Sequence, residues 1–258
     1  MIQMKIVKNM ISIAFLALFF TACSKGEDPI VEPEPEEEGF LAGTNWVPAR
    51  VKKINDYAYL DEKFQVVYIV NLPCPDVGNS SSEGHRPLGF NFDSSMPIYS
   101  DNHNAGDLSA YTFETSSTWH FYVDNIYNSS FNTNATTADG QAGRGKVTVA
   151  KTLFDELDQV PSTADFTKNV NHLGLSEPND SWGFYVFANH ELRPYKDRSM
   201  LFLLQDGRYV KVQIVNLYKD NPAEAPNWRE PTTKTLAPYL NFKYYVQKEV
   251  GNTTIKTR

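Results

Sequence analysis

Residues 200–214, MLFLLQDGRYVKVQI, decide the fold class. Residues 200–204 form a short apolar run, and residues 209–214 alternate between apolar and polar side chains, with Lys211 on the polar side. This period of two predicts strands with one buried and one wet face, as in antiparallel sheets. Asp206-Gly207 lies between the runs and is typical of a type I′ turn, which needs positive φ at both central residues. The stretch therefore predicts a β-hairpin.

The same pattern recurs along the chain. Further short runs rich in β-branched and aromatic residues are interpreted as strands, and they span residues 64–72, 119–123, 182–187 and 240–246. Turn-forming residues dominate the stretches between several of these runs. We therefore predict an all-β fold of mostly antiparallel strands in a single sandwich-like domain, with at most one short helix at residues 152–157.

Composition narrows the class of protein. The 258 residues are 41% hydrophobic and 13% aromatic, which excludes a wholly disordered chain. The formal net charge of −7 provides no basic field for DNA or RNA, so we expect no nucleic-acid partner. Only two cysteines occur, which excludes both a disulfide scaffold and a cysteine-based zinc site.

The N-terminal segment is interpreted as a targeting signal. Residues 1–22 combine an early positive charge with a ten-residue apolar run at 11–20, too short to cross a bilayer as a helix. Such a segment is typical of a secretory signal peptide. Residues 20–23 (FTAC) resemble a bacterial lipobox, which would make Cys23 the lipidated mature N-terminus, although Phe20 replaces the usual Leu. The alternative is ordinary signal cleavage beside an incidental Cys23.

Residues 23–38 are predicted to be a tether. Seven acidic residues lie between Glu27 and Glu38, and the segment is rich in proline, so it favours an extended spacer. An acidic cluster just after a lipidated Cys also resembles the surface-export signal of Bacteroidota lipoproteins. We therefore expect residues 39–258 to form a domain that a lipid anchor alone holds at the outer membrane, exposed at the cell surface. With Cys23 acylated, Cys74 is expected to be an unpaired thiol.

The C-terminal half resembles the HmuY family of haem-binding lipoproteins. Family members show a Trp followed by aromatics and a His, then an apolar strand, an Asp-Gly pair and a strand of the K-x-Q-I type. The corresponding elements here are Trp182, Tyr185, His190, residues 200–204, Asp206-Gly207 and residues 211–214. The resemblance covers roughly residues 85–248, and His120 and Asn132 depart from the family pattern upstream.

This resemblance implies an all-β fold, outer-membrane anchoring, and capture of haem that is handed to a TonB-dependent outer-membrane receptor. Haem iron needs one or two axial donors, normally a His nitrogen or a Met sulfur. His190 is the first candidate, because it follows an aromatic strand in the family motif, and His172 is the second. The alternative for each is a solvated loop histidine. Met200 and His120 rank lower as iron ligands, because core packing is favoured for Met200 and a structural role is favoured for His120.

Basic residues close to His190 are the candidates for pairing with the haem propionates, which favour Lys or Arg. They are Arg193, Lys196 and Arg198. His85 and His103 are interpreted as solvated loop residues.

Two other classes of function compete with haem capture. Nucleophile-elbow, zinc-protease, P-loop and dinucleotide motifs are absent from the sequence, so we expect no enzyme. A non-haem surface or adhesion lipoprotein, such as a glycan-binding module, is the stronger rival, because abundant Trp and Tyr suit sugar stacking. A haem site needs donors that converge on one slot, whereas a glycan site needs an exposed aromatic platform.

Overall fold

The computed structural model describes residues 39–74, 88–99, 119–124, 128–133, 145–166, 172–175, 180–189, 191–222 and 239–258. The chain divides into two units, Met1–Glu37 and Glu38–Arg258. All the described residues belong to the second unit.

The described residues form strands and contain no α-helix, which confirms the all-β prediction. The strands in the described part of the chain are β1 (Lys52–Lys53), β2 (Ala58–Asp61), β3 (Val66–Pro73), β4 (Leu88–Asn91), β5 (Met96–Tyr99), β6 (Phe121–Asp124), β7 (Ser130–Asn132), β8 (Gly145–Ala150), β9 (His172–Leu173), β10 (Gly183–Val186), β11 (Glu191–Pro194), β12 (Ser199–Leu204), β13 (Tyr209–Asn216) and β14 (Tyr239–Val246).

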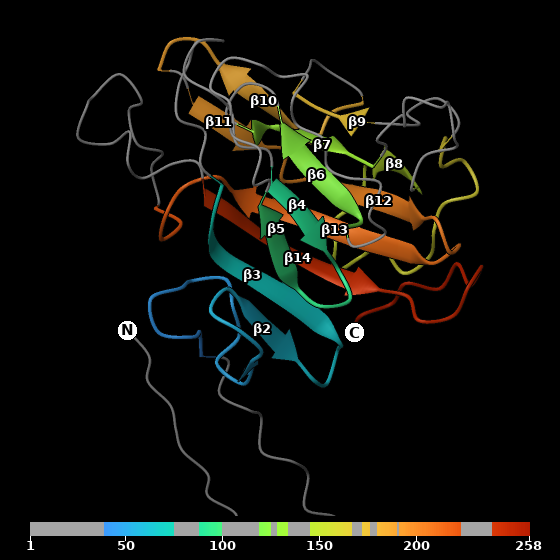
Figure 1. The fold of residues 1–258 in the computed structure, drawn as a ribbon, viewed down its shortest axis with the longest axis horizontal. Coiled ribbons are helices and arrows are strands. Elements are labelled where there is room, and N and C mark those ends of the chain that lie inside the picture. The colour runs from blue at the N-terminus through green and yellow to red at the C-terminus, as the bar shows by residue number, and fades with distance from the viewer. Residues whose placement is uncertain are drawn as a thin grey trace, which may run out of the picture. The chain divides into compact units, whose positions relative to one another are not determined.

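These strands form two main sheets and a separate hairpin (Figure 1). A seven-stranded sheet has the order β1-β2-β3-β14-β13-β12-β8, and a five-stranded sheet has the order β5-β4-β6-β7-β9. Strands β10 and β11 form the hairpin. Every pairing between these strands is antiparallel, as the alternating pattern predicts.

Aromatic side chains from both sheets form the core of the sandwich. Phe90 of β4 lies 5.3 Å from Phe242 of β14, measured between ring centroids. Phe121 of β6 lies 5.6 Å from Phe202 of β12. Both pairs join a strand of the five-stranded sheet to a strand of the seven-stranded sheet, so the two sheets pack face to face over a layer of phenylalanines.

The outer face of the seven-stranded sheet is also covered, which corrects one expectation. The alternation in β13 places Lys211 on a wet face, yet its side chain is fully buried. Its ammonium donates hydrogen bonds to the carbonyl oxygens of Phe154 (2.8 Å) and Leu157 (3.0 Å) and to Oγ1 of Thr257 (3.0 Å). The segment after β8 and the C-terminal segment therefore close over this face, and period two alone does not reveal such a covering layer.

The hairpin between β12 and β13 is confirmed, but the predicted turn type is wrong. Gly207 has a φ of +87°, whereas Asp206 does not have a positive φ. The carbonyl of Leu204 accepts from the Gly207 N–H at 3.0 Å, and the Leu204 N–H donates to the Arg208 carbonyl at 2.9 Å. This is a three-residue loop ending in a left-handed glycine, which is the next most common hairpin loop after the two-residue type I′ and II′ turns.

Residues 152–157 make a single turn and no helix. The Leu153 carbonyl accepts from the N–H groups of Glu156 and Leu157, each at 3.0 Å, and the pattern goes no further. The predicted strands at 64–72, 119–123, 182–187 and 240–246 correspond to β3, β6, β10 and β14.

Candidate ligand-binding site

The β10–β11 hairpin is held in place at its base. The indole Nε1–H of Trp182 donates to the Ser129 carbonyl at 2.7 Å. Gly183 is needed beside it, because a Cβ there would lie 2.6 Å from the carbonyl oxygen of Arg193 in the opposite strand. The start of β10 is therefore fixed against the five-stranded sheet.

Tyr218, which follows β13, ties the hairpin to the seven-stranded sheet. Its buried hydroxyl accepts from the Leu192 N–H at 2.8 Å and lies 3.3 Å from the Leu192 carbonyl, to which it donates. This single hydroxyl satisfies both backbone groups of a residue in β11. The distance between hairpin and sheet is thereby set, and a cavity lies along this junction.

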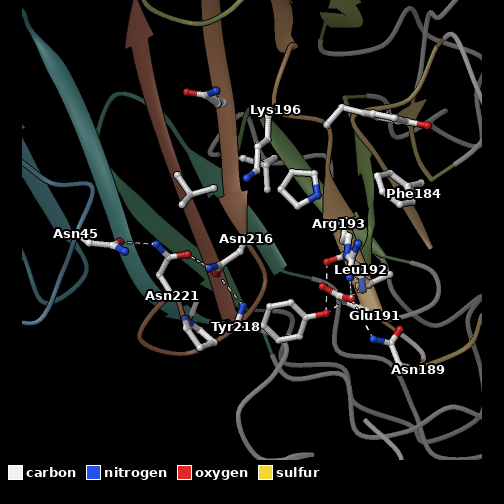
Figure 2. A pocket seen from close by; sticks show the side chains of 16 residues that line it. Asn45, Phe184, Asn189, Glu191, Leu192, Arg193, Lys196, Asn216, Tyr218 and Asn221 are labelled. Atoms are coloured by element: carbon white, nitrogen blue, oxygen red, sulfur yellow. Dashed lines mark hydrogen bonds and ion pairs between the residues drawn. The ribbon is translucent and has the colours of Figure 1, made fainter. Parts of the chain in front are cut away.

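The cavity has a volume of about 1070 Å³, the size of a site for a small organic molecule (Figure 2). Its walls come from the hairpin, the end of β13 and three loops. The lining residues are Asn45, Phe184, Asn189, Glu191, Leu192, Arg193, Pro194, Tyr195, Lys196, Gln213, Ile214, Val215, Asn216, Tyr218, Asn221 and Pro222. They mix apolar and aromatic side chains with carboxamides and a few charges.

One wall of the cavity is a chain of hydrogen-bonded asparagines. Asn221 donates to Oδ1 of Asn45 at 2.7 Å and accepts a hydrogen bond from Asn216. Behind this wall, the buried Asn241 donates to Oδ1 of Asn216 at 2.9 Å and to the Tyr218 carbonyl at 2.7 Å. Because each amide is oriented by the next, the polar wall is organised before any ligand arrives.

A compensated ion pair occupies the opposite side of the cavity (Figure 2). Arg193 Nη2 lies 2.6 Å from Glu191 Oε2, which also accepts from Asn189 Nδ2 at 3.1 Å. The hydrogen bond from Arg193 lowers the pKa of the Glu191 carboxyl below its ordinary value, and the same contact raises the pKa of Arg193. The pair therefore stays ionised over the physiological range, with its two charges directed at each other.

The three cations predicted for propionate binding lie in different environments. Arg193 and Lys196 both line the cavity, whereas Arg198 is not among its lining residues. The Arg198 side chain is only 9% exposed, donates to the Ser181 carbonyl at 3.1 Å and places its guanidinium carbon 3.7 Å from the centre of the Tyr195 ring. Its contacts are those of a residue that supports the loop after β11.

The two lower-ranked iron ligands lie away from the cavity lining. Met200 in β12 is buried in the main core, in agreement with the core role favoured for it. His120, which precedes β6, accepts the Phe92 N–H on Nδ1 at 3.0 Å and stacks on the Phe92 ring. Its Nε2 lies 3.8 Å from Asp93, and burial lowers the pKa of the imidazole, so His120 has the contacts of a structural residue.

Several residues singled out in the sequence lie outside the described residues. They are Cys23, His85, His103 and His190. His172 pairs with Asn132 through the β7–β9 ladder, but its side chain is likewise not described. Among the described residues no group of three or more His, Cys, Asp or Glu could hold a metal ion, and the Cys74 side chain is buried.

Sequence reasoning missed most of the polar lining. Asn45, Asn216 and Asn221 come from segments far apart in the chain, and nothing local distinguishes them from ordinary loop asparagines. Glu191 could have been predicted as a site residue, because it lies in the sequence between two candidate residues, His190 and Arg193.

No family model matches the chain, and no curated protein matches it closely enough to count as similar. In the part of the chain that the structure describes, no helix is long and apolar enough to cross a membrane.

Proposed function

We propose that this protein is a surface-tethered, haem-binding lipoprotein that captures haem for uptake through a TonB-dependent outer-membrane receptor. The lipobox-like start, the acidic tether, the HmuY-like motifs and a cavity of suitable size support this function. A binding role is proposed rather than catalysis.

The cavity lining provides the observation on which this function depends most. Arg193 and Lys196, two of the three residues named for propionate binding, line a single cavity of about 1070 Å³. Asn189 and Glu191 line it too, and His190 stands between them in the sequence. Two propionate candidates thus line one cavity, and the first iron-ligand candidate is close to them in the sequence.

The lining chemistry suits an amphiphilic porphyrin. Apolar and aromatic groups for the macrocycle are supplied by Phe184, Leu192, Pro194 and Ile214, while cations for the carboxylates lie in and after β11. When bound, haem would supply an iron centre that binds His nitrogen or Met sulfur. The proposed first ligand is His190, and His172 is the proposed second.

A haemin titration tests this function. The fragment Gly39–Arg258 contains every described strand and is titrated with haemin, followed by absorbance in the oxidised and reduced states. We expect a saturable one-to-one spectrum of low-spin iron that is lost in His190→Ala and weakened in His172→Ala. His85→Ala serves as the matched control and is expected to bind as the wild type does.

The outcomes separate function from ligand choice. Absence of any saturable spectral change would overturn haem capture. A low-spin spectrum that survives both substitutions would retain the function but reject these ligands, and Met200→Ala and His120→Ala would be examined next.

Glycan binding is a second candidate, favoured by a specific feature of the same cavity. Five carboxamide side chains are among its described lining residues, together with aromatic rings, and such groups recognise sugar hydroxyls and faces. The carboxamides are Asn45, Asn189, Gln213, Asn216 and Asn221. Failure of the haemin titration would move this candidate to first place.

A further inference from the structure

The three basic residues that follow residue 190 differ in how much of their charge is available to a ligand. Arg198 is enclosed, with its guanidinium hydrogen-bonded to the Ser181 carbonyl and lying over the Tyr195 ring. Arg193 borders the cavity, but its guanidinium is 2.6 Å from the Glu191 carboxylate. A ligand carboxylate at Arg193 would have to compete with a protein carboxylate that is already in place.

Lys196 is different. It lines the cavity, its side chain is exposed, and its ammonium has no ion-pair or hydrogen-bond partner among the described residues. In Figure 2 the Lys196 side chain extends toward the other lining residues from the upper part of the view, apart from the Glu191–Arg193 pair. The loop that carries it is anchored by its neighbour, because the Tyr195 ring contacts both the Phe184 ring, at 4.9 Å, and the Arg198 guanidinium.

The charges of the described lining residues therefore do not cancel locally. Glu191 and Arg193 neutralise each other, and Lys196 leaves one positive charge on the lining of the cavity. An ammonium beside a partly enclosed, apolar surface attracts a carboxylate more strongly than one in open solvent does.

We propose that Lys196 is the residue by which this cavity selects ligands that carry a carboxylate, and that Arg193 is a positioning residue that holds Glu191. Naming the ligand carboxylate as a porphyrin propionate rests on the function proposed above. Lys196 thus determines specificity for the acid form of the ligand, whereas iron ligation is a separate contact.

Metal-free protoporphyrin IX and its dimethyl ester test this assignment, because the ester lacks the negative charge of the propionates. Both are titrated by fluorescence against the full-length protein, with the same non-ionic detergent in every sample. Lys196→Met removes the ammonium but keeps the length of the side chain. We expect it to weaken binding of protoporphyrin IX about tenfold and to leave binding of the dimethyl ester unchanged.

A charge-matched control uses Lys52→Met. Lys52 lies in β1, pairs with Glu62 at 3.2 Å and is not among the cavity-lining residues. The same loss of one positive charge is expected to leave both titrations unchanged. For Arg193→Met, we expect equal weakening for the acid and the ester, because the unpaired Glu191 disturbs the hairpin, and we expect Glu191→Gln in the same chain to restore binding.

Two results would overturn the assignment. If the Lys196→Met variant binds protoporphyrin IX as the wild type does, the ammonium does not contact a propionate. Equal loss for acid and ester would show that Lys196 acts through packing rather than charge. In both cases the wild type still binds porphyrin, so the function proposed above stands. A wild type that binds neither protoporphyrin IX nor haemin would reject that function and this assignment together.

Discussion

At the scale of single residues, Lys211 has an environment that its sequence context does not indicate, because its side chain is buried on the face predicted to be exposed. Burial lowers the pKa of its ammonium from 10.5 to about 8, although the ammonium donates hydrogen bonds to three oxygen atoms. Between these two values the unfolded chain binds more protons than the folded chain. The free energy of unfolding therefore rises with pH through this window as the buried charge is relieved.

We predict that Lys211→Met removes this pH dependence. Between pH 7.5 and 9.5 the wild type should gain about 2 kcal/mol in the free energy of unfolding relative to the variant, because a pKa difference of this size implies such a gain. Urea unfolding at several pH values measures both proteins. Burial also raises the pKa of Tyr68 and Tyr244, which acts in the opposite direction at higher pH, so the window ends at 9.5. Equal slopes in the two proteins would contradict the prediction.

At the scale of elements, the β10–β11 hairpin depends on one side chain from outside it. Strand β11 pairs with β10 on one side, and Leu192 presents its backbone groups to the Tyr218 hydroxyl. Without that hydroxyl a buried N–H and its carbonyl lose their partner, and the hairpin is free to move away from β13. The shape of the cavity is thus coupled to a single contact between two elements.

We predict that Tyr218→Phe lowers the free energy of unfolding by about 1–3 kcal/mol, because it leaves buried backbone groups unsatisfied. The same change should raise hydrogen exchange at the Leu192 amide. Tyr57→Phe is the matched control, since the Tyr57 hydroxyl has no hydrogen-bond partner among the described residues. A Tyr218→Phe protein with unchanged stability and unchanged exchange at Leu192 would show that the hydroxyl does not fix the hairpin.

At the scale of the folded unit, the two sheets are joined mainly through phenylalanines. Phe121 is 1% exposed and contacts rings from both sheets, with Phe131 at 5.4 Å and Phe202 at 5.6 Å. Such side chains contribute through both transfer from water and close packing. The stability of the whole unit should therefore respond to a change at this layer and not to a change at an exposed ring.

We predict that Phe121→Ala lowers the free energy of unfolding by about 3–5 kcal/mol. Phe187, at the end of β10, is 80% exposed, so Phe187→Ala should change it by less than about 0.5 kcal/mol. Urea unfolding followed by tryptophan fluorescence measures both variants. Similar losses for the two would mean that the sheets are not held together by this layer.

More of the fold than of the candidate site could be predicted from the sequence. Strands β3, β12, β13 and β14 could be predicted from short apolar or alternating runs, because the pleat places alternate side chains on opposite faces wherever a strand forms. The short strands β1, β2 and β9 have too few residues to show a period. Arg193 and Lys196 could be singled out because they are close in sequence to a recognisable motif.

Local sequence by itself determined the all-β class, the hairpin at Asp206-Gly207 and the candidate cations, since each depends on neighbours within a few residues. Only the tertiary structure decided that Lys211 is buried, because the groups that cover it lie 46 to 57 residues away in the chain. It also decided the asparagine wall, in which Asn45 and Asn221 meet across 176 residues. Such contacts depend on strand order and packing, which no local pattern encodes.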